Sequence, residues 1–123
     1  MGQFWKYLQV NRDKMRNILL IGDFNSNKIW DEWDRWWNHS DVVNELKELG
    51  MESFYHKING EEQGKESIPT LYFQRKIERP YHIDYVFGSI EFINILTKLE
   101  VGTAEQWLDI SDHMPIITQY KKY

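Results

Sequence analysis

The apolar positions at the start of the chain predict a helix followed by a buried strand. Residues 4–15 carry apolar side chains at a weakly amphipathic spacing, which is typical of a helix. Residues 18–21 then form a short, continuous apolar run that Gly22 closes. A run of this length with β-branched members predicts a strand that is buried on both faces.

Two candidate N-caps follow this strand and predict two further helices. Asn27 precedes a tryptophan-rich segment and predicts a helix through residues 30–37. Ser40 is the second candidate N-cap, and residues 42–49 carry apolar side chains at helical spacing. Gly50 stands where a left-handed C-cap is expected.

The rest of the chain is dominated by predicted strands, at residues 53–58, 70–74, 81–89, 92–101 and 115–120. Asn59-Gly60 indicates a turn, and residues 61–67 form a polar loop. Strands mixed with two or three helices favour an α/β (α+β) fold, a mixed β-sheet with flanking helices. With 123 residues, the chain is expected to form a single domain, 1–123.

The amino-acid composition excludes several classes of protein and one class of metal site. Hydrophobic residues make up 41% and charged residues 28%, as in soluble globular proteins. Without cysteine there is neither a disulfide framework nor a thiolate metal site. No apolar run is long enough for a membrane span, and the first ten residues do not resemble a signal peptide, so a cytoplasmic location is expected.

The net charge restricts how the protein would bind a phosphate substrate. A formal charge of -4 argues against a basic surface that binds nucleic acid by itself. An acidic protein can still act on a phosphate group if a divalent cation lies between the two. A metal-assisted reaction is therefore the form of phosphate chemistry that this composition allows.

Three short segments carry the residue types for such chemistry: residues 22–25, 82–87 and 111–115. In an extended chain alternate residues share a face, so Asp23 and Asn25 point together at the end of the first strand. Asp84 is an acid inside an otherwise apolar strand, and His113 lies in a polar turn that opens onto an apolar strand.

Hydrolysis of a phosphoester needs a cation, a base for the attacking water and donors for the phosphate oxygens. His113 is the natural base, and a carboxylate must orient its ring. The side chain of the adjacent Asp112 diverges from His113 in an extended backbone, so Asp112 is the better metal ligand and Asp84 the better orienting group. Oxygen ligands without cysteine suit Mg²⁺ or Mn²⁺.

In order and spacing, the three segments resemble the last three signature blocks of the endonuclease/exonuclease/phosphatase superfamily, the DNase I-like proteins. Each block alone is weak, but the three together are specific, and residues 64–66 and 69–72 extend the likeness over nearly the whole chain. The resemblance implies metal-dependent hydrolysis of a phosphoester in a nucleic acid, a phospholipid or an inositol phosphate.

The resemblance also implies roles for the residues. Asp23 would position or deprotonate the attacking water, or protonate the leaving group, and Asn25 would contact the phosphate. Asp84 would pair with His113, which would bind phosphate or serve as the base. Asp112 would stand at the metal.

The chain departs from the family pattern at its start. The family's first blocks, an Asn and a Glu that is the principal metal ligand, should precede the Gly-Asp-Phe-Asn block, yet residues 1–21 contain no Glu. The chain therefore resembles the C-terminal half of the four-layer α/β sandwich. Half of this fold would leave one face of its sheet open for a second copy or for the missing N-terminal half. Weak metal binding, and inactivity of the chain alone, would follow from the absent Glu.

Other interpretations of the same residues remain open. Asp23, Asn25 and Asp34 lie at EF-hand spacing, although Lys28 replaces the required Gly. Asp23 and Asn25 also suit a turn and helix cap, Asp84 suits a buried structural acid, and His113 suits a surface position. A non-catalytic binding or assembly module on the same scaffold is the alternative function. The remaining histidines are interpreted as surface residues at 39 and 56 and as a structural residue at 82.

Overall fold

The computed structural model describes residues 1–122. In chain order its helices, 3-10 turns (η) and strands are α1 (Gly2–Val10), η1 (Arg12–Lys14), β1 (Leu19–Asp23), η2 (Lys28–Trp30), α2 (His39–Glu48), β2 (Met51–Ser53), α3 (Phe54–Asn59), β3 (Leu71–Tyr72), η3 (Phe73–Arg75), β4 (Pro80–Tyr81), β5 (Asp84–Ser89), α4 (Ile90–Ile95), β6 (Leu96–Val101), α5 (Ala104–Trp107) and β7 (Ile116–Tyr120). The predicted α+β class is confirmed.

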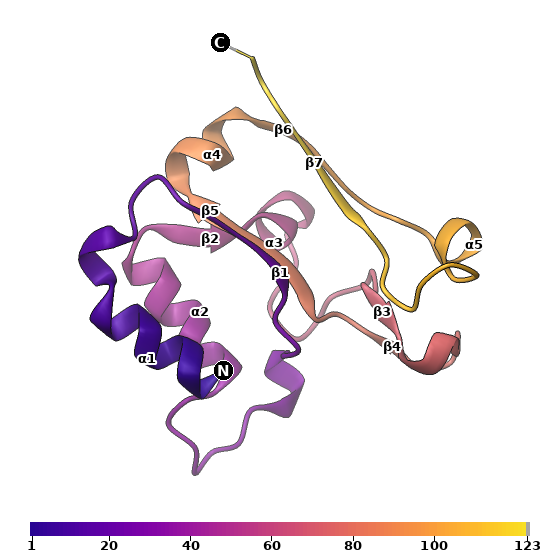
Figure 1. Cartoon of the computed structure of the whole chain (residues 1–123), viewed down its shortest axis with the longest axis horizontal. Coiled ribbons are helices and arrows are strands. Elements are labelled where there is room, and N and C mark those ends of the chain that lie inside the picture. Colours follow the sequence, from indigo (N-terminus) through magenta and orange to yellow (C-terminus); the bar gives the residue numbers. More distant parts are fainter. Residues whose placement is uncertain (123) are drawn as a thin grey trace.

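A three-stranded antiparallel sheet with the order β1-β5-β2 forms the centre of the molecule. Side chains alternate along β5, so Tyr85 and Phe87 point toward α1 and α2, which cover this face (Figure 1). Leu8 of α1 and Leu46 of α2 are fully buried against them. Each such side chain contributes about 1.5–3 kcal/mol through removal of its apolar surface from water. This packing determines which face of β1 and β5 is left for the site.

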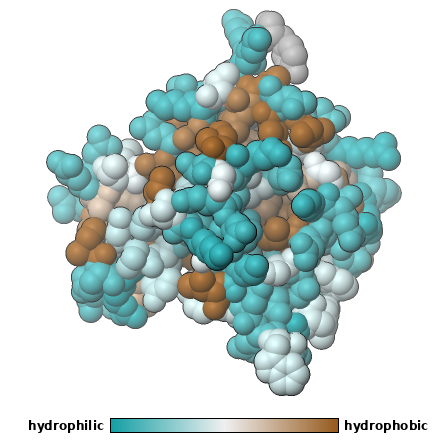
Figure 2. Space-filling model, turned by 180° about the vertical axis from the view of Figure 1, so that it is seen from behind, coloured by the Kyte–Doolittle hydropathy of each residue, from teal (hydrophilic) through white to brown (hydrophobic). Residues whose placement is uncertain are grey.

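On the other face of the sheet, α3 packs close to β5. A Cβ added at Gly88 would lie 2.5 Å from Phe54 Cζ, so only glycine allows this approach. Two small antiparallel sheets, β3–β4 and β6–β7, extend away from the central sheet on this side (Figure 1). Figure 2 shows apolar side chains gathered below the C-terminus, over β6 and β7. Ile117 of β7 is 47% exposed.

The two helices predicted after the first strand have different boundaries from those expected. Asn27 caps only the 3-10 turn η2 by accepting a hydrogen bond from Ile29 N, and no helix continues to residue 37. The reason lies in Asn38, whose side chain accepts from Glu32 N and donates to Arg35 O, and so folds residues 32–38 into a compact turn. Asn38, rather than Ser40, is the N-cap of α2.

Two predicted strands are partly helical. Residues 53–58 form α3 beyond Ser53, and Phe54 and Tyr55 are both buried, which two adjacent residues of a one-sided strand could not be. Residues 92–101 begin in α4 and become the strand β6 only at Leu96. In both places a short apolar stretch fits either periodicity, so the pattern alone does not separate the two structures.

The first strand is not buried on both faces, contrary to the prediction. Ile21 in β1 is 65% exposed, because it lies on the face of β1 that α1 and α2 do not cover. Beside it lies a hollow of about 430 Å³, lined by Met1, Gln3, Phe4, Leu20, Ile21, Asp23 and Phe24. None of the helices in the described part of the chain is both long and apolar enough to span a membrane.

Candidate active site

Antiparallel pairing places two carboxylates directly opposite each other at one end of the central sheet. In the register of β1 and β5, Asp23 is the partner of Asp84. Directly opposed residues of an antiparallel pair point to the same face, so both side chains lie on the face away from α1 and α2. The pairing continues one step further, because Phe24 N donates to Ile83 O at 2.9 Å.

A third segment brings His113 to this pair. His113 forms an isolated bridge with Leu71 of β3, and Met114 N donates to Thr70 O at 2.7 Å. The hydroxyl oxygen of Thr70, which is fully buried, accepts from Ile83 N at 2.9 Å and Asp84 N at 3.1 Å. The backbone and side chain of Thr70 therefore hold the start of β5 and the His113 segment together.

The three side chains converge closely. His113 Nδ1 donates to Asp84, at 3.0 Å from Oδ2 and 3.1 Å from Oδ1. His113 Nε2 lies 3.8 Å from Asp23 Oδ2. Ligand atoms of Asp23, Asp84 and His113 all lie within 4.8 Å of one another. The side chain of Asp84 is 15% exposed, against 38% for His113 and 48% for Asp23. Asp84 is therefore the buried member of the cluster, and Asp23 lies on its solvent-exposed side.

The charges in this cluster act on one another. Burial acts to lower the pKa of His113, but the hydrogen bond to Asp84 and the negative charges of Asp84, Asp23 and Asp112 outweigh it and raise this pKa above its usual value. Burial raises the pKa of Asp84, and the contacts with Thr70 and His113 only partly offset it. His113 therefore keeps its second proton to a higher pH than a free histidine.

Asn25 lies beside the cluster in a strained backbone conformation. Its φ is 47°, in the left-handed region, which Asn tolerates better than most residues. Its backbone N–H donates to Asp23 Oδ1 at 2.7 Å, so the Asp23 carboxylate and the Asn25 loop orient each other. The Asn25 side chain is exposed.

Asp112 is held near the cluster but is not one of its three converging residues. Its carbonyl oxygen accepts from Tyr72 N at 2.8 Å, which ties this turn to β3. Its carboxylate acts on His113 only through its charge. The role of Asp112 as a metal ligand stays a prediction, as do the catalytic roles of Asp23, Asn25, Asp84 and His113.

The donor set fits a hard divalent cation in its chemistry. Asp23 and Asp84 offer carboxylate oxygens, which Mg²⁺ and Mn²⁺ prefer, and Mn²⁺ also accepts imidazole nitrogen. Asp84 is occupied with His113 Nδ1 and one oxygen of Asp23 with Asn25 N, so few donors remain free. A cation here would need water or further ligands to complete six-fold coordination.

A hollow with aromatic walls adjoins Asn25. It has a volume of about 240 Å³ and is lined by Asn25, Trp30, Leu71, Phe73, Arg79, Tyr81 and Ile83. The rings of Trp30 and Tyr81 lie 5.4 Å apart, and the Arg79 guanidinium lies 4.5 Å from the centre of the Phe73 ring. The hollow thus offers flat apolar walls and one cation beside the residue expected to contact phosphate.

The structure changes the interpretation of the other histidines. His39 is 1% exposed and the His56 side chain is 10% exposed. The prediction that both lie on the surface is therefore wrong. His82, 5% exposed, donates from Nδ1 to Ile68 O at 2.8 Å, while its Nε2 is buried without a partner. The polar loop of residues 61–67 contains a buried acid, Glu66, and no local pattern in the sequence indicates its burial.

The EF-hand alternative does not agree with the local structure. An EF-hand loop follows a helix, whereas Asp23 is the last residue of the strand β1.

The whole arrangement is the DNase I-like fold, as the resemblance predicted. No family model and no curated protein matches the sequence. Among solved structures, the chain is similar to the 3′ phosphatase NExo from Neisseria bound to product DNA hairpin, with a TM-score of 0.71 and 20% identity over 98% of this chain and 53% of that chain. The 3′-5′ exonuclease NExo from Neisseria meningitidis gives the same values.

Two further structures share the fold. The endonuclease domain of TRAS1, a telomere-specific non-LTR retrotransposon, matches with a TM-score of 0.66 and 17% identity over 98% of this chain and 52% of that chain. The AP endonuclease LMAP from Leishmania major matches with a TM-score of 0.65 and 11% identity over 99% of this chain and 43% of that chain. The chain spans about half the length of the solved structures that it resembles, as expected for half of the sandwich.

Proposed function

We propose that the protein takes part in the divalent-metal-dependent hydrolysis of phosphoester bonds, with nucleic acid as the substrate. The observation that carries the proposal is the convergence of Asp23, Asp84 and His113 within 4.8 Å at an open end of the sheet. Two carboxylates and an imidazole in this arrangement supply a metal ligand, an oriented histidine and a contact for phosphate.

The hydrogen bonds indicate a separate role in the reaction for each of these side chains. Asp84 accepts from His113 Nδ1 and so orients the ring with Nε2 toward the solvent-exposed side of the cluster. Since the pKa of His113 is raised, Nε2 carries a proton over a wider pH range, which favours donation to a phosphate oxygen over service as a base. Asp23 then stands as the group that positions or deprotonates water, and Asn25 donates to the phosphate.

Asp23 and Asp112 are the residues that would hold Mg²⁺ or Mn²⁺ beside this pair. Such an ion neutralises phosphate charge and lowers the pKa of a bound water. Because few oxygen donors of the Asp23–Asp84–His113 cluster are free, we expect weak metal affinity and slow turnover by this chain.

The hollow beside Asn25 supports nucleic acid over a phospholipid or inositol phosphate. A nucleobase or deoxyribose presents a flat or apolar surface to aromatic side chains, and base–aromatic stacking contributes about 1–3 kcal/mol per base. Trp30 and Tyr81 form walls of this hollow, and Arg79 also lines it. These walls could bind a nucleobase or deoxyribose next to a phosphate at Asn25. One solved structure with this fold is named a 3′ phosphatase bound to product DNA hairpin, and another is named a 3′-5′ exonuclease.

An assay of DNA cleavage and of 3′-phosphate release with millimolar Mg²⁺ or Mn²⁺ tests the proposal. We expect slow hydrolysis that EDTA abolishes and that His113→Ala lowers by about 100-fold or more, in the range for loss of a catalytic donor. Asp13→Asn, in the exposed turn η1 outside the site, is the matched control and should keep full activity. Activity that persists in EDTA or in His113→Ala would contradict the proposal.

A second function, a non-catalytic assembly module, is favoured by one observation. The apolar hollow beside β1 and the exposed Ile21 leave an edge of the sheet available to a partner. Absence of any hydrolysis of DNA, phosphoinositide or phospholipid substrates, combined with self-association, would favour this module over the enzyme.

A further inference from the structure

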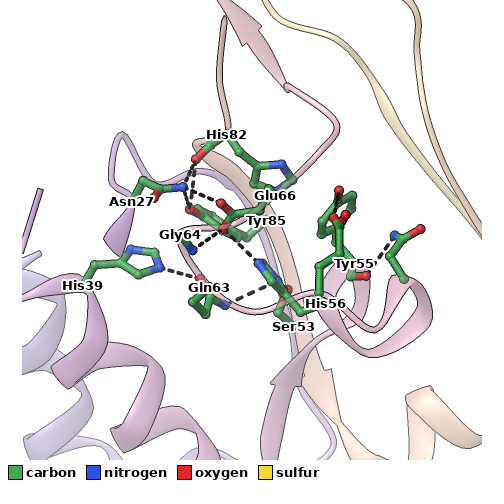
Figure 3. A network of polar contacts seen from close by, with 12 residues as sticks. Asn27, His39, Ser53, Tyr55, His56, Gln63, Gly64, Glu66, His82 and Tyr85 are labelled. Atoms are coloured by element: carbon green, nitrogen blue, oxygen red, sulfur yellow. Dashed lines mark hydrogen bonds and ion pairs between the residues drawn. The ribbon is translucent and has the colours of Figure 1, made fainter. Parts of the chain in front are cut away.

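A buried polar network lies around Glu66 (Figure 3), and it includes Asn27, two residues beyond Asn25. We call it the Glu66 network, and it consists of Asn27, His39, Ser53, His56, Gln63, Gly64, Glu66, His82 and Tyr85, which Figure 3 labels, together with Ser26. Ser26 joins it through His39 Nδ1 and the Tyr85 hydroxyl. None of these residues belongs to the Asp23–Asp84–His113 cluster, and the proposed hydrolysis uses none of them.

Glu66 is the centre of the network and the carboxylate that connects its parts. Its side chain is only 3% exposed. Oε1 accepts from His56 Nε2 at 2.9 Å and from Gly64 N at 3.0 Å, while Oε2 accepts from Asn27 Nδ2 at 3.2 Å. A buried carboxylate is tolerated only when its oxygens are satisfied in this way.

One arm of the network holds Asn27, two residues beyond Asn25. Asn27 is 2% exposed, and besides Glu66 its Nδ2 contacts His82 O at 2.8 Å. Its Oδ1 accepts from Ile29 N and so begins the turn η2. Both ends of the Asn27 amide are therefore fixed, one by the backbone of its own turn and the other by Glu66 and the His82 carbonyl.

The other arm holds Ser26, the residue next to Asn25. The Tyr85 hydroxyl donates to Ser26 O at 2.8 Å, and Ser26 Oγ lies 3.0 Å from His39 Nδ1. His39 Nε2 contacts Gln63 Oε1 at 2.8 Å, so this nitrogen donates and Nδ1 accepts from the Ser26 hydroxyl. Burial lowers the pKa of His39, which agrees with a ring that donates from one nitrogen and accepts at the other.

Gln63 connects the two arms, because its side chain contacts both His39 and His56. Its Nε2 lies 3.3 Å from His56 Nδ1, and Ser53 Oγ contacts the same nitrogen at 2.6 Å. Since His56 Nδ1 accepts, Nε2 carries the hydrogen that is donated to Glu66. With these tautomers every donor between Ser26 and Glu66 has an acceptor.

We propose that Glu66 is a positioning residue, which holds Asn25 in its phosphate-binding conformation by fixing Asn27 and, through His56 and Gln63, Ser26. Asn25 has a left-handed backbone, and such a conformation persists only when its surroundings determine it on both sides. On the preceding side the Asp23 carboxylate accepts from Asn25 N. The Glu66 network supplies the constraint on the following side.

The inference rests on the proposed function for the phosphate at Asn25, but its structural part stands apart from catalysis. Glu66→Gln is the informative variant. The amide oxygen of the introduced side chain can still accept from His56 and Gly64, whereas its NH₂ group would face the NH₂ group of Asn27 at the position of the 3.2 Å contact. The substitution therefore removes the link to the Asn25 loop and leaves the other contacts of Glu66 in place.

The experiment measures backbone amide signals of residues 23–27 by NMR and their response to inorganic phosphate with Mg²⁺ present, at a temperature where each variant is folded. We expect Glu66→Gln to shift or broaden the Asn25 and Asn27 signals and to weaken phosphate binding by about tenfold, as for loss of one hydrogen bond to a charged group. In hydrolysis of bis(p-nitrophenyl) phosphate we expect kcat to fall more than KM rises.

Glu61→Gln is the matched control, because Glu61 lies in the same loop and accepts from Tyr55 OH and Ser67 N but from no residue of the Asn25 loop. It should leave the Asn25 signals and the phosphate affinity unchanged. If Glu66→Gln fails to fold, Gln63→Ala removes the His39–His56 link from a half-exposed position and should shift the Ser26 and Asn25 signals.

Unchanged Asn25 and Asn27 signals in folded Glu66→Gln, or equal effects of Glu61→Gln, would overturn the inference. If Glu66→Gln does not fold, unchanged Ser26 and Asn25 signals in Gln63→Ala would do the same. A wild-type protein that neither binds phosphate nor hydrolyses the ester would refute the proposed function alone, since the amide signals would still decide whether Glu66 positions the loop.

Discussion

Replacing Glu66 with Gln should also remove a large, pH-dependent part of the stability of the fold. Burial acts to raise the pKa of Glu66, but the hydrogen bonds from His56, Gly64 N and Asn27 outweigh it and lower this pKa to about 2, from an ordinary value of 4.5. The folded protein therefore accommodates the ionised carboxylate much better than the protonated acid. Gln has nearly the shape of that protonated acid and stands in for it at every pH.

The magnitude follows from linkage. The pKa of Glu66 moves from 4.5 to about 2, and each pKa unit corresponds to about 1.36 kcal/mol, so ionisation of Glu66 contributes about 3 kcal/mol to the free energy of unfolding near neutral pH. Because the folded pKa is depressed, this contribution is present above pH 4.5 and is lost as pH falls toward 2. About half of it should be lost between about pH 5 and pH 3.

Urea unfolding of wild type and Glu66→Gln across this pH range measures the difference directly. We expect the wild type to be more stable by about 3 kcal/mol near pH 7 and the gap to narrow steadily as the solution is acidified. A gap that is independent of pH would mean that Glu66 acts through packing rather than through its charge, and a gap below about 1 kcal/mol would refute the account of its hydrogen bonds.

Three further predictions concern the site, the sheet and the open edge. Asp84→Asn should lower the pKa of His113, seen by NMR titration of the ring, so that phosphate binding is lost at lower pH than in wild type; an unchanged titration would contradict the pairing. Gly88→Ala should lower the free energy of unfolding by about 1–3 kcal/mol, because its Cβ would overlap the Phe54 ring, and a neutral result would mean that α3 moves freely. Sedimentation should show self-association at high concentration that Ile21→Lys abolishes; a monomeric wild type would argue against an open edge.

The meeting of Asp23, Asp84 and His113 could be predicted from the sequence because it follows largely from strand alternation. Asp23 and Asp84 each end or begin a strand with a clear apolar pattern, and once β1 and β5 pair in antiparallel register the two carboxylates must share a face. The position of His113 beside Asp84 depends on the hydrogen bond between Met114 N and Thr70 O, which the sequence does not reveal. The location of His113 in a polar turn before the last apolar strand, however, could be predicted from the sequence pattern.

The Glu66 network could not be predicted in this way. The burial of His39 and His56 depends on how the loop of residues 61–67 folds back over α2 and α3, and that loop has no periodicity. The helix in residues 54–59 likewise arises from tertiary packing, since the same apolar residues would suit a strand. Where long-range contacts decide the structure, local patterns carry little information.

The central claim is that Asp23, Asp84 and His113 form one site for a cation and a phosphate. Titration with Mn²⁺ followed by amide NMR tests it most directly, because a bound paramagnetic ion broadens signals only near its site. We predict that the signals of these three residues and of Asp112 disappear first, and that Asp23→Asn abolishes the effect while Asp13→Asn does not. Broadening centred elsewhere in the chain, or unchanged broadening in Asp23→Asn, would contradict the account.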